Sequence, residues 1–92
     1  MVYVDDAEVP RHGYLWCHLL ADRLAELHEF ASLIGVSKRA FHRGARHPHY
    51  DITLWQRQLA LREGARAVTA REAVRVARRM LAEQVEQYRL FA

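Results

Sequence analysis

An apolar run that passes directly into a helical pattern most constrains the fold of this chain. Residues 14–21 read YLWCHLLA, which has the length of a buried strand and includes two aromatic residues. Apolar side chains then recur at helical spacing over residues 23–34, with Asp22 as the expected N-cap and Gly35 as the expected stop. A strand followed at once by an amphipathic helix predicts a domain that combines α and β structure.

A first strand is expected in VYVDD, residues 2–6, where β-branched and aromatic residues precede two aspartates. Pro10 and Gly13 indicate a loop over residues 8–13. Because a parallel crossover needs a dozen or more residues, this short loop predicts that the first strand pairs with residues 14–21 in antiparallel fashion.

The middle of the chain is expected to contain one short turn and one helix. Residues 36–41 predict a helical turn capped by Ser37, and residues 42–50, which include a glycine and a proline, are expected to be irregular. Thr53 is the expected cap of a helix over residues 54–63, which a glycine follows.

The last third of the chain predicts a short strand and a long helix. Residues 65–68, ARAV, are expected to form the strand, and TARE at residues 69–72 has the form of a capping box. The helix is expected over residues 70–88, with apolar residues along one side. Such a helix packs on the sheet or docks on a second copy, so a homo-oligomer formed through it is expected.

These elements predict a single α/β or α+β domain over residues 1–92, in the order β-β-α-α-β-α. The sheet is expected to be short, with two or three strands packed against about three helices. No apolar run approaches the roughly 18 residues that span a bilayer, and no signal peptide opens the chain. We therefore expect a cytoplasmic protein with no membrane partner, in which the lone Cys17 is buried and inert.

Charge is unevenly distributed along the sequence. The first 36 residues carry six acidic and two basic residues, whereas the remainder carries twelve basic and five acidic residues. This asymmetry favours an anionic partner, such as a phosphate-containing ligand or a nucleic acid, or self-association of unlike faces. Nearly all of the basic residues are arginines, which suit phosphate, although a GC-rich genome produces the same bias. Three arginines of the last helix lie along one edge at helical spacing: Arg71, Arg75 and Arg78.

Two aspartates at the end of the first strand are candidates for a divalent metal site. Asp5 and Asp6 stand where a strand meets solvent, although aspartate also favours a simple strand-ending turn. Because successive strand residues point to opposite faces, one of the two is expected to face any given site.

His18 lies within the apolar second strand, on the same face as Trp16 and Leu20. It is either a hydrogen-bonded core histidine or a catalytic side chain that projects into a cleft. The expected antiparallel pairing places Asp5 near Tyr14, about 13 Å along the strand from His18.

The densest group of polar residues is KRAFHRGARHPHYD, residues 38–51. In one interpretation, His49 and Asp51, together with His47, are ligands for zinc, iron or manganese. A plain basic loop, in which Asp51 helps to cap the next helix, is the simplest alternative.

A second functional interpretation of the same segment is anion binding. Arg43 and Arg46 are expected to bind phosphate while Tyr50 or Phe41 stacks on a base. Phosphate-binding glycine loops and the nucleophile motif of the α/β-hydrolases do not occur in the sequence.

Several segments together resemble the short bacterial and phage proteins grouped as domain of unknown function 4031. They are VYVDD, WCHLLAD leading into ELHEFASLIGV, HYDI, and REGARAVTAREAVR. The resemblance extends from Tyr3 to about Met80 and implies a stand-alone domain of this length, without supplying an activity. The segment RGAR and His47 depart from the expected pattern, which leaves His49 and Asp51 as the better ligand candidates.

Three functions are compatible with these residues. The first is a metal-dependent or acid–base hydrolase of a phosphorylated or nucleotide substrate, with catalytic candidates Asp5, Asp6, His18, His49 and Asp51. A divalent ion is then expected on Asp5, His49 and Asp51, with substrate phosphate on Arg43, Arg46 and Tyr50. The second is a non-catalytic module that binds nucleic acid, and the third is a homodimeric accessory protein.

Overall fold

The computed structural model describes residues 1–42 and 48–91, without the side chains of residues 87, 88 and 91. The strands are β1 (Val2–Val4), β2 (Val9–Arg11), β3 (Tyr14–Ala21), β4 (Phe41–His42), β5 (His49–Thr53) and β6 (Arg66–Ala67). The helices are α1 (Leu24–Leu33), the 3-10 turn η1 (Lys38–Ala40), α2 (Leu54–Arg62) and α3 (Ala70–Phe91). The expected combination of α and β structure is confirmed.

The six described strands form one mixed sheet in the order β4-β5-β3-β1-β6. β2 pairs with the beginning of β3, and β1 pairs with its end. All neighbours are antiparallel except β1 and β6, which run parallel. The antiparallel pairing of the first strand with residues 14–21 is confirmed, whereas the expected sheet of two or three strands was too small and the expected element order was wrong.

Of the unpredicted strands, β2 and β4 have only three and two residues and are too short to produce a periodic signal, whereas β5 has five residues and does produce one. Residues 8–13, expected to be a loop, contain β2, and residues 42–50, expected to be irregular, contain parts of β4 and β5. In β5, buried Tyr50 and Ile52 alternate with polar residues, and this period of two is typical of a half-buried strand. β6 falls within the strand expected at residues 65–68.

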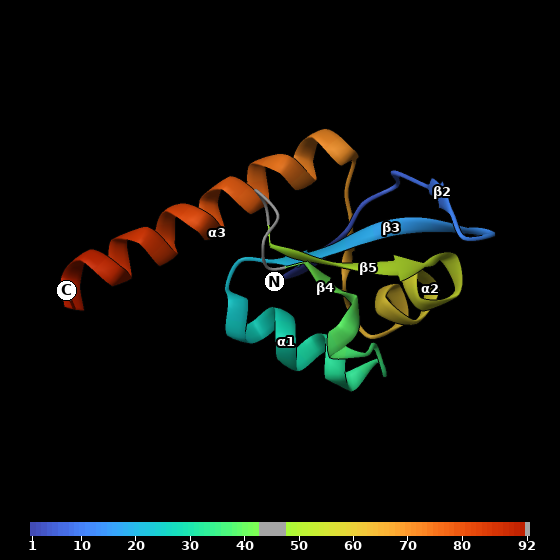
Figure 1. The fold of residues 1–92 in the computed structure, drawn as a ribbon, viewed down its shortest axis with the longest axis horizontal. Coiled ribbons are helices and arrows are strands. Elements are labelled where there is room, and N and C mark those ends of the chain that lie inside the picture. The colour runs from blue at the N-terminus through green and yellow to red at the C-terminus, as the bar shows by residue number, and fades with distance from the viewer. Residues whose placement is uncertain (43–47, 92) are drawn as a thin grey trace.

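α1 and α2 cover one face of the sheet (Figure 1). Cys17 and Leu19 of β3 and Ile52 of β5 are fully buried on this face, where they pack with Leu27 of α1 and Ala60 of α2. Because successive side chains of a strand point to opposite faces, the residues between these project from the other side of the sheet.

α3 lies on that other face and covers part of it (Figure 1). Leu20 of β3 and Tyr3 of β1 pack there against Ala73, Val76 and Ala77 of α3. This smaller apolar cluster is confined to the β1 side of the sheet. The neighbouring part of the same face, on β3, β5 and β4, carries polar side chains.

Three helix starts carry the caps that were predicted. Thr53 and Gln56 exchange side-chain and backbone hydrogen bonds in a capping box at the start of α2. Thr69 and Glu72 do the same at the start of α3. The hydroxyl of Ser37 accepts a backbone N–H in η1. These local signals therefore located the helix starts correctly.

Asp22 does not cap α1, contrary to expectation. The N-cap position is Arg23, which makes no side-chain cap. Asp22 instead accepts a hydrogen bond from the Tyr3 hydroxyl at 3.0 Å and lies 3.5 Å from the amino group of Met1. The end of the helix is as expected, because Gly35 has a φ of 77°, a conformation that favours glycine.

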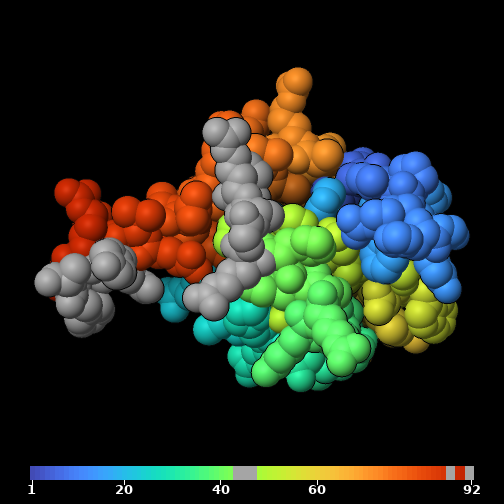
Figure 2. Space-filling view, in the orientation of Figure 1, coloured from blue at the N-terminus to red at the C-terminus, as the bar shows by residue number. Residues whose placement is uncertain are grey.

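The C-terminal part of α3 extends beyond the rest of the molecule (Figures 1 and 2). The helix has 22 residues and ends three residues after the expected position 88. Its exposed apolar residues in this part include Leu81, Val85 and Leu90. Across residues 1–42 and 48–91, no helix is both long and apolar enough to cross a bilayer.

Candidate functional site

Asp5 bonds to His18 through both its backbone and its carboxylate. The Asp5 backbone N–H donates to the His18 carbonyl oxygen at 3.1 Å. The Asp5 Oδ1 accepts the His18 backbone N–H at 2.7 Å, and its Oδ2 lies 2.7 Å from the His18 Nδ1. Asp5 is only 2% exposed. This buried carboxylate therefore sets the position of both the β3 backbone and the imidazole ring.

The expected placement of Asp5 beside Tyr14 was wrong. The register of β1 continues so that Asp5 lies opposite His18. The Tyr14 end of β3 is taken by β2, whose Arg11 is the partner of Tyr14. β1 and β2 thus share one edge of β3, and residues 5–8 form the break between them.

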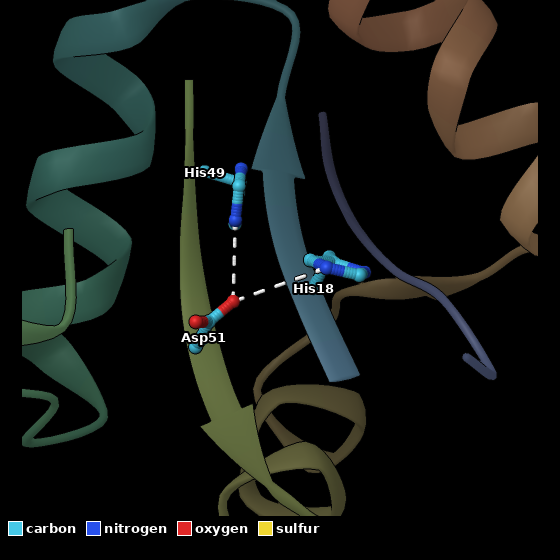
Figure 3. A group of neighbouring side chains, drawn as sticks. All are labelled: His18, His49 and Asp51. Atoms are coloured by element: carbon cyan, nitrogen blue, oxygen red, sulfur yellow. Dashed lines mark ion pairs between the residues drawn. The ribbon is translucent and has the colours of Figure 1, made fainter. Parts of the chain in front are cut away.

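The sheet face that α3 only partly covers carries a row of polar side chains. The β3–β5 register places His18 opposite Asp51, and the β4–β5 register places His42 opposite His49. Directly opposed residues share a face, and so do residues two apart on one strand. His18 of the neighbouring strand β3 and His49, two residues before Asp51 on β5, accordingly point toward Asp51 (Figure 3).

Asp51 is the centre of this row. Its Oδ1 lies 3.2 Å from the His49 Nε2 and 3.9 Å from the His18 Nε2. Its Oδ2 lies 2.7 Å from both the His42 Nε2 and the Arg11 Nη2. One carboxylate oxygen is therefore held by Arg11 and His42, while the other faces the two remaining imidazoles.

The row is accessible from solvent although its carboxylates are buried. The side chains of His18, His42 and Arg11 are 33%, 42% and 48% exposed, whereas that of Asp51 is 9% exposed. The buried carboxylates thus lie beneath imidazoles that are partly exposed, from 15% for His49 to 42% for His42.

Asp5 and His18 stabilise each other's charged form. The hydrogen bond to Asp5 raises the pKa of His18, against the effect of burial, and the negative charge of Asp51 adds to the rise. Burial favours a higher pKa for Asp5, but hydrogen bonds from the His18 ring and backbone outweigh it and lower that pKa. A neutral His18 then keeps its proton on Nδ1, which leaves Nε2 free to bind a ligand on the Asp51 side.

We expect this pair to make the stability of the metal-free protein depend on pH. The raised pKa of His18 contributes stability below its unfolded pKa of about 6.5, which is lost as pH rises through the folded value. The lowered pKa of Asp5 contributes stability above about pH 4, which is lost as pH falls through the folded value. In chelator-treated protein, the deficit in unfolding free energy of Asp5→Asn should be largest between about pH 4 and 6.5 and narrow above it. A deficit that urea titrations find unchanged from pH 5 to 9 would contradict this.

His18, His49 and Asp51 form a ligand set that suits a divalent transition metal. One donor atom from each lies within 4.8 Å of the others. Metal–ligand bonds of about 2.0–2.2 Å bring donors closer than this, so an ion requires small inward rotations of the rings. Asp5 on the His18 Nδ1 and Arg11 on the Asp51 Oδ2 have the positions of outer partners that orient metal ligands.

Other predicted site residues lie away from this row. Asp6 is exposed and accepts a hydrogen bond from the Ala70 backbone N–H at the start of α3. Tyr50 is 1% exposed on the opposite sheet face, and its hydroxyl lies 2.7 Å from the His28 Nδ1. Cys17 is buried, as expected. Three considered residues fall outside the described residues: Arg43, Arg46 and His47.

Two residues of the row, Arg11 and His42, were not identified from the sequence. Arg11 reaches Asp51 across β3 from a segment expected to be a loop, and no local pattern marks it. His42 had a detectable signal, because the alternation in β5 indicates a strand. If the preceding residues form a second strand that pairs antiparallel with β5, His42 comes to lie beside His49, as the structure shows.

Comparisons with known proteins identify a family. The model of a family described as "Protein of unknown function (DUF4031)" matches residues 2–80, a range that contains every residue of the polar row. No curated protein and no solved structure matches the chain.

Proposed function

This chain belongs to the family of proteins of unknown function DUF4031, and we propose from the geometry of its site that it is a metal-dependent hydrolase of a phosphorylated substrate. The observation that carries the proposal is the convergence of the His18 Nε2 and the His49 Nε2 on one oxygen of Asp51. Outer hydrogen bonds to His18 and to the other Asp51 oxygen are already formed.

His18, His49 and Asp51 are the proposed ligands, with Asp5 as an outer partner rather than a ligand. Both Asp5 oxygens are already engaged by His18, through the backbone N–H and the Nδ1. An ion on three protein ligands keeps open positions for water and substrate. Such an ion supplies a hydroxide nucleophile near neutral pH, because it lowers the pKa of its bound water.

Arg11 and His42 are the residues proposed to act on the substrate. Arg11 is half exposed and uses one terminal nitrogen for Asp51, so we assign the phosphate of the substrate to its other guanidinium donors. A hydroxide held by such an ion would attack phosphorus and break the bond to the leaving oxygen. His42, whose side chain is 42% exposed and whose Nε2 lies 2.7 Å from the Asp51 Oδ2, is the residue proposed to supply the proton which that oxygen takes up.

The test is metal content followed by turnover. Tag-free wild-type protein, loaded with zinc, manganese or iron(II) and desalted, is expected to retain about one ion per chain by mass spectrometry. His49→Ala is expected to retain much less, because it removes one of three ligands. Hydrolysis of bis(p-nitrophenyl) phosphate, followed through release of p-nitrophenolate, is expected only from the loaded wild-type protein.

His12→Asn is the matched control, because it removes a histidine from the exposed turn between β2 and β3. His12 has a φ of 53°, which asparagine tolerates, so the substitution keeps the turn. Metal retention equal to wild type is expected for this variant. The metal site is contradicted if His49→Ala retains as much metal as the wild-type protein, or if the wild-type protein retains none. Stoichiometric metal without hydrolysis would contradict only the proposed hydrolase activity.

A further inference from the structure

A second polar region lies between α3 and the β1–β6 edge of the sheet. It is a groove of about 610 Å³, open to solvent. Arginines predominate among the charged residues that line it: Arg66 of β6 and Arg75, Arg78 and Arg79 of α3. None of the residues of the metal site lines this groove.

The positive charge of the groove exceeds the negative charge of its lining, in which four arginines stand against one glutamate. Glu72 is the one acidic residue in the lining, and it is engaged in the capping box with the Thr69 backbone N–H. Among the residues whose side chains are described, no ion pair involves Arg66, Arg75 or Arg78. Four guanidinium groups around one groove repel one another, and an anion removes that repulsion.

The charge changes sign along α3, which locates the anion site. An adjoining hollow shares Tyr3 and Arg79 with the groove, but its other charged residues are three acids and one further arginine: Asp22, Glu83, Glu86 and Arg23. The basic end coincides with the N-terminal half of the helix. An anionic ligand is therefore directed to the Arg66–Arg75 end.

We propose that this groove binds the phosphates of a nucleic-acid strand, independently of any metal or hydrolysis. Guanidinium groups suit phosphate oxygens, and arginines on two turns of one helix match successive phosphates better than a single one. Tyr3 is the one aromatic residue of the lining, and its hydroxyl is bonded to Asp22. The Tyr3 ring also packs in the apolar cluster under α3, so we expect the groove to contact the nucleic-acid backbone without stacking on a base, and to bind independently of sequence and with strong salt dependence.

The test is fluorescence anisotropy of a labelled 12-nucleotide single-stranded DNA, titrated with the full chain in EDTA at several salt concentrations. Arg75→Gln/Arg79→Gln is expected to weaken binding about 25-fold at 0.1 M salt, because each lost contact lowers the salt slope by about 0.7. Arg39→Gln/Arg62→Gln removes the same charge from η1 and α2, elements on the opposite face of the sheet, and is expected to leave the slope unchanged.

Three outcomes would overturn the proposal. They are absence of binding by the wild-type protein, equal losses in the groove variant and its control, and tighter binding of ATP than of the oligonucleotide. His49→Ala, tested in parallel without metal, should bind DNA as the wild type does. The same variant is used to test the metal site, so its metal content and its DNA binding show separately whether the metal site or the DNA-binding groove is contradicted. Circular dichroism of both double variants checks that the fold is retained.

Discussion

Asp51→Asn should weaken zinc binding more than any other single substitution in the polar row. Asparagine has the same size, so the strand pairing and the contacts of the buried side chain are largely kept. The substitution removes the anionic donor and leaves Arg11 and His42 without their shared negative partner. We expect a loss in affinity well beyond the about 10–100-fold that removal of an outer partner costs. Competition with a chromophoric chelator at pH 7.5 measures it.

Asp5→Asn provides the graded comparison. Asp5 contacts His18 and none of the other proposed ligands, so its loss should cost about 10–100-fold, the range typical of an outer partner. The expected order of affinity is wild type, then Asp5→Asn, then Asp51→Asn. If Asp5→Asn proves the weaker binder, Asp5 is itself a ligand, as the sequence had suggested, and the assignment of inner and outer residues is reversed.

The helices were predictable because their signals are local. The caps at Thr53 and Thr69 depend on residues three positions apart, which form the same hydrogen bonds in almost any tertiary context. Asp22 shows the limit of this reasoning. It has the right chemistry for a cap, but Tyr3 and the chain's amino group compete for its carboxylate, and both come from a distant part of the sequence.

The candidate site was predictable in part of its residues, without Arg11 and His42, and not in its geometry. Asp5, His18, His49 and Asp51 were all identified as candidates from their chemistry. Which of them meet depends on strand register, and β2, a three-residue strand inside an apparent loop, shifts that register. Period-two patterns need four or more residues, so strands of two or three residues leave no signal to correct the error.

Adjacent side chains of β5 point to opposite faces of the sheet. This leads to a second prediction with a large expected effect, on the stability of the fold. Ile52 is fully buried against Cys17 on the α1–α2 side, one position from Asp51. Ile52→Ala should lower the free energy of unfolding by about 2–5 kcal/mol, through lost burial and the cavity left behind. For a domain of this size, the midpoint of thermal unfolding falls by about 4–8 °C for each kcal/mol.

The opposite faces of β5 should make stability and metal binding separable. Below its melting temperature, Ile52→Ala should bind zinc nearly as tightly as wild type, whereas Asp51→Asn should lose zinc with a much smaller change in stability. Ile52→Val, which is expected to lower the free energy of unfolding by about 0.5–1.5 kcal/mol, replaces the alanine variant in this comparison if that variant does not fold. Val9→Ala, on an exposed residue of β2, should change stability by less than about 0.5 kcal/mol. Loss of zinc from a folded Ile52→Val protein would mean that core packing behind the sheet positions the ligands, in addition to the hydrogen bonds on their own face.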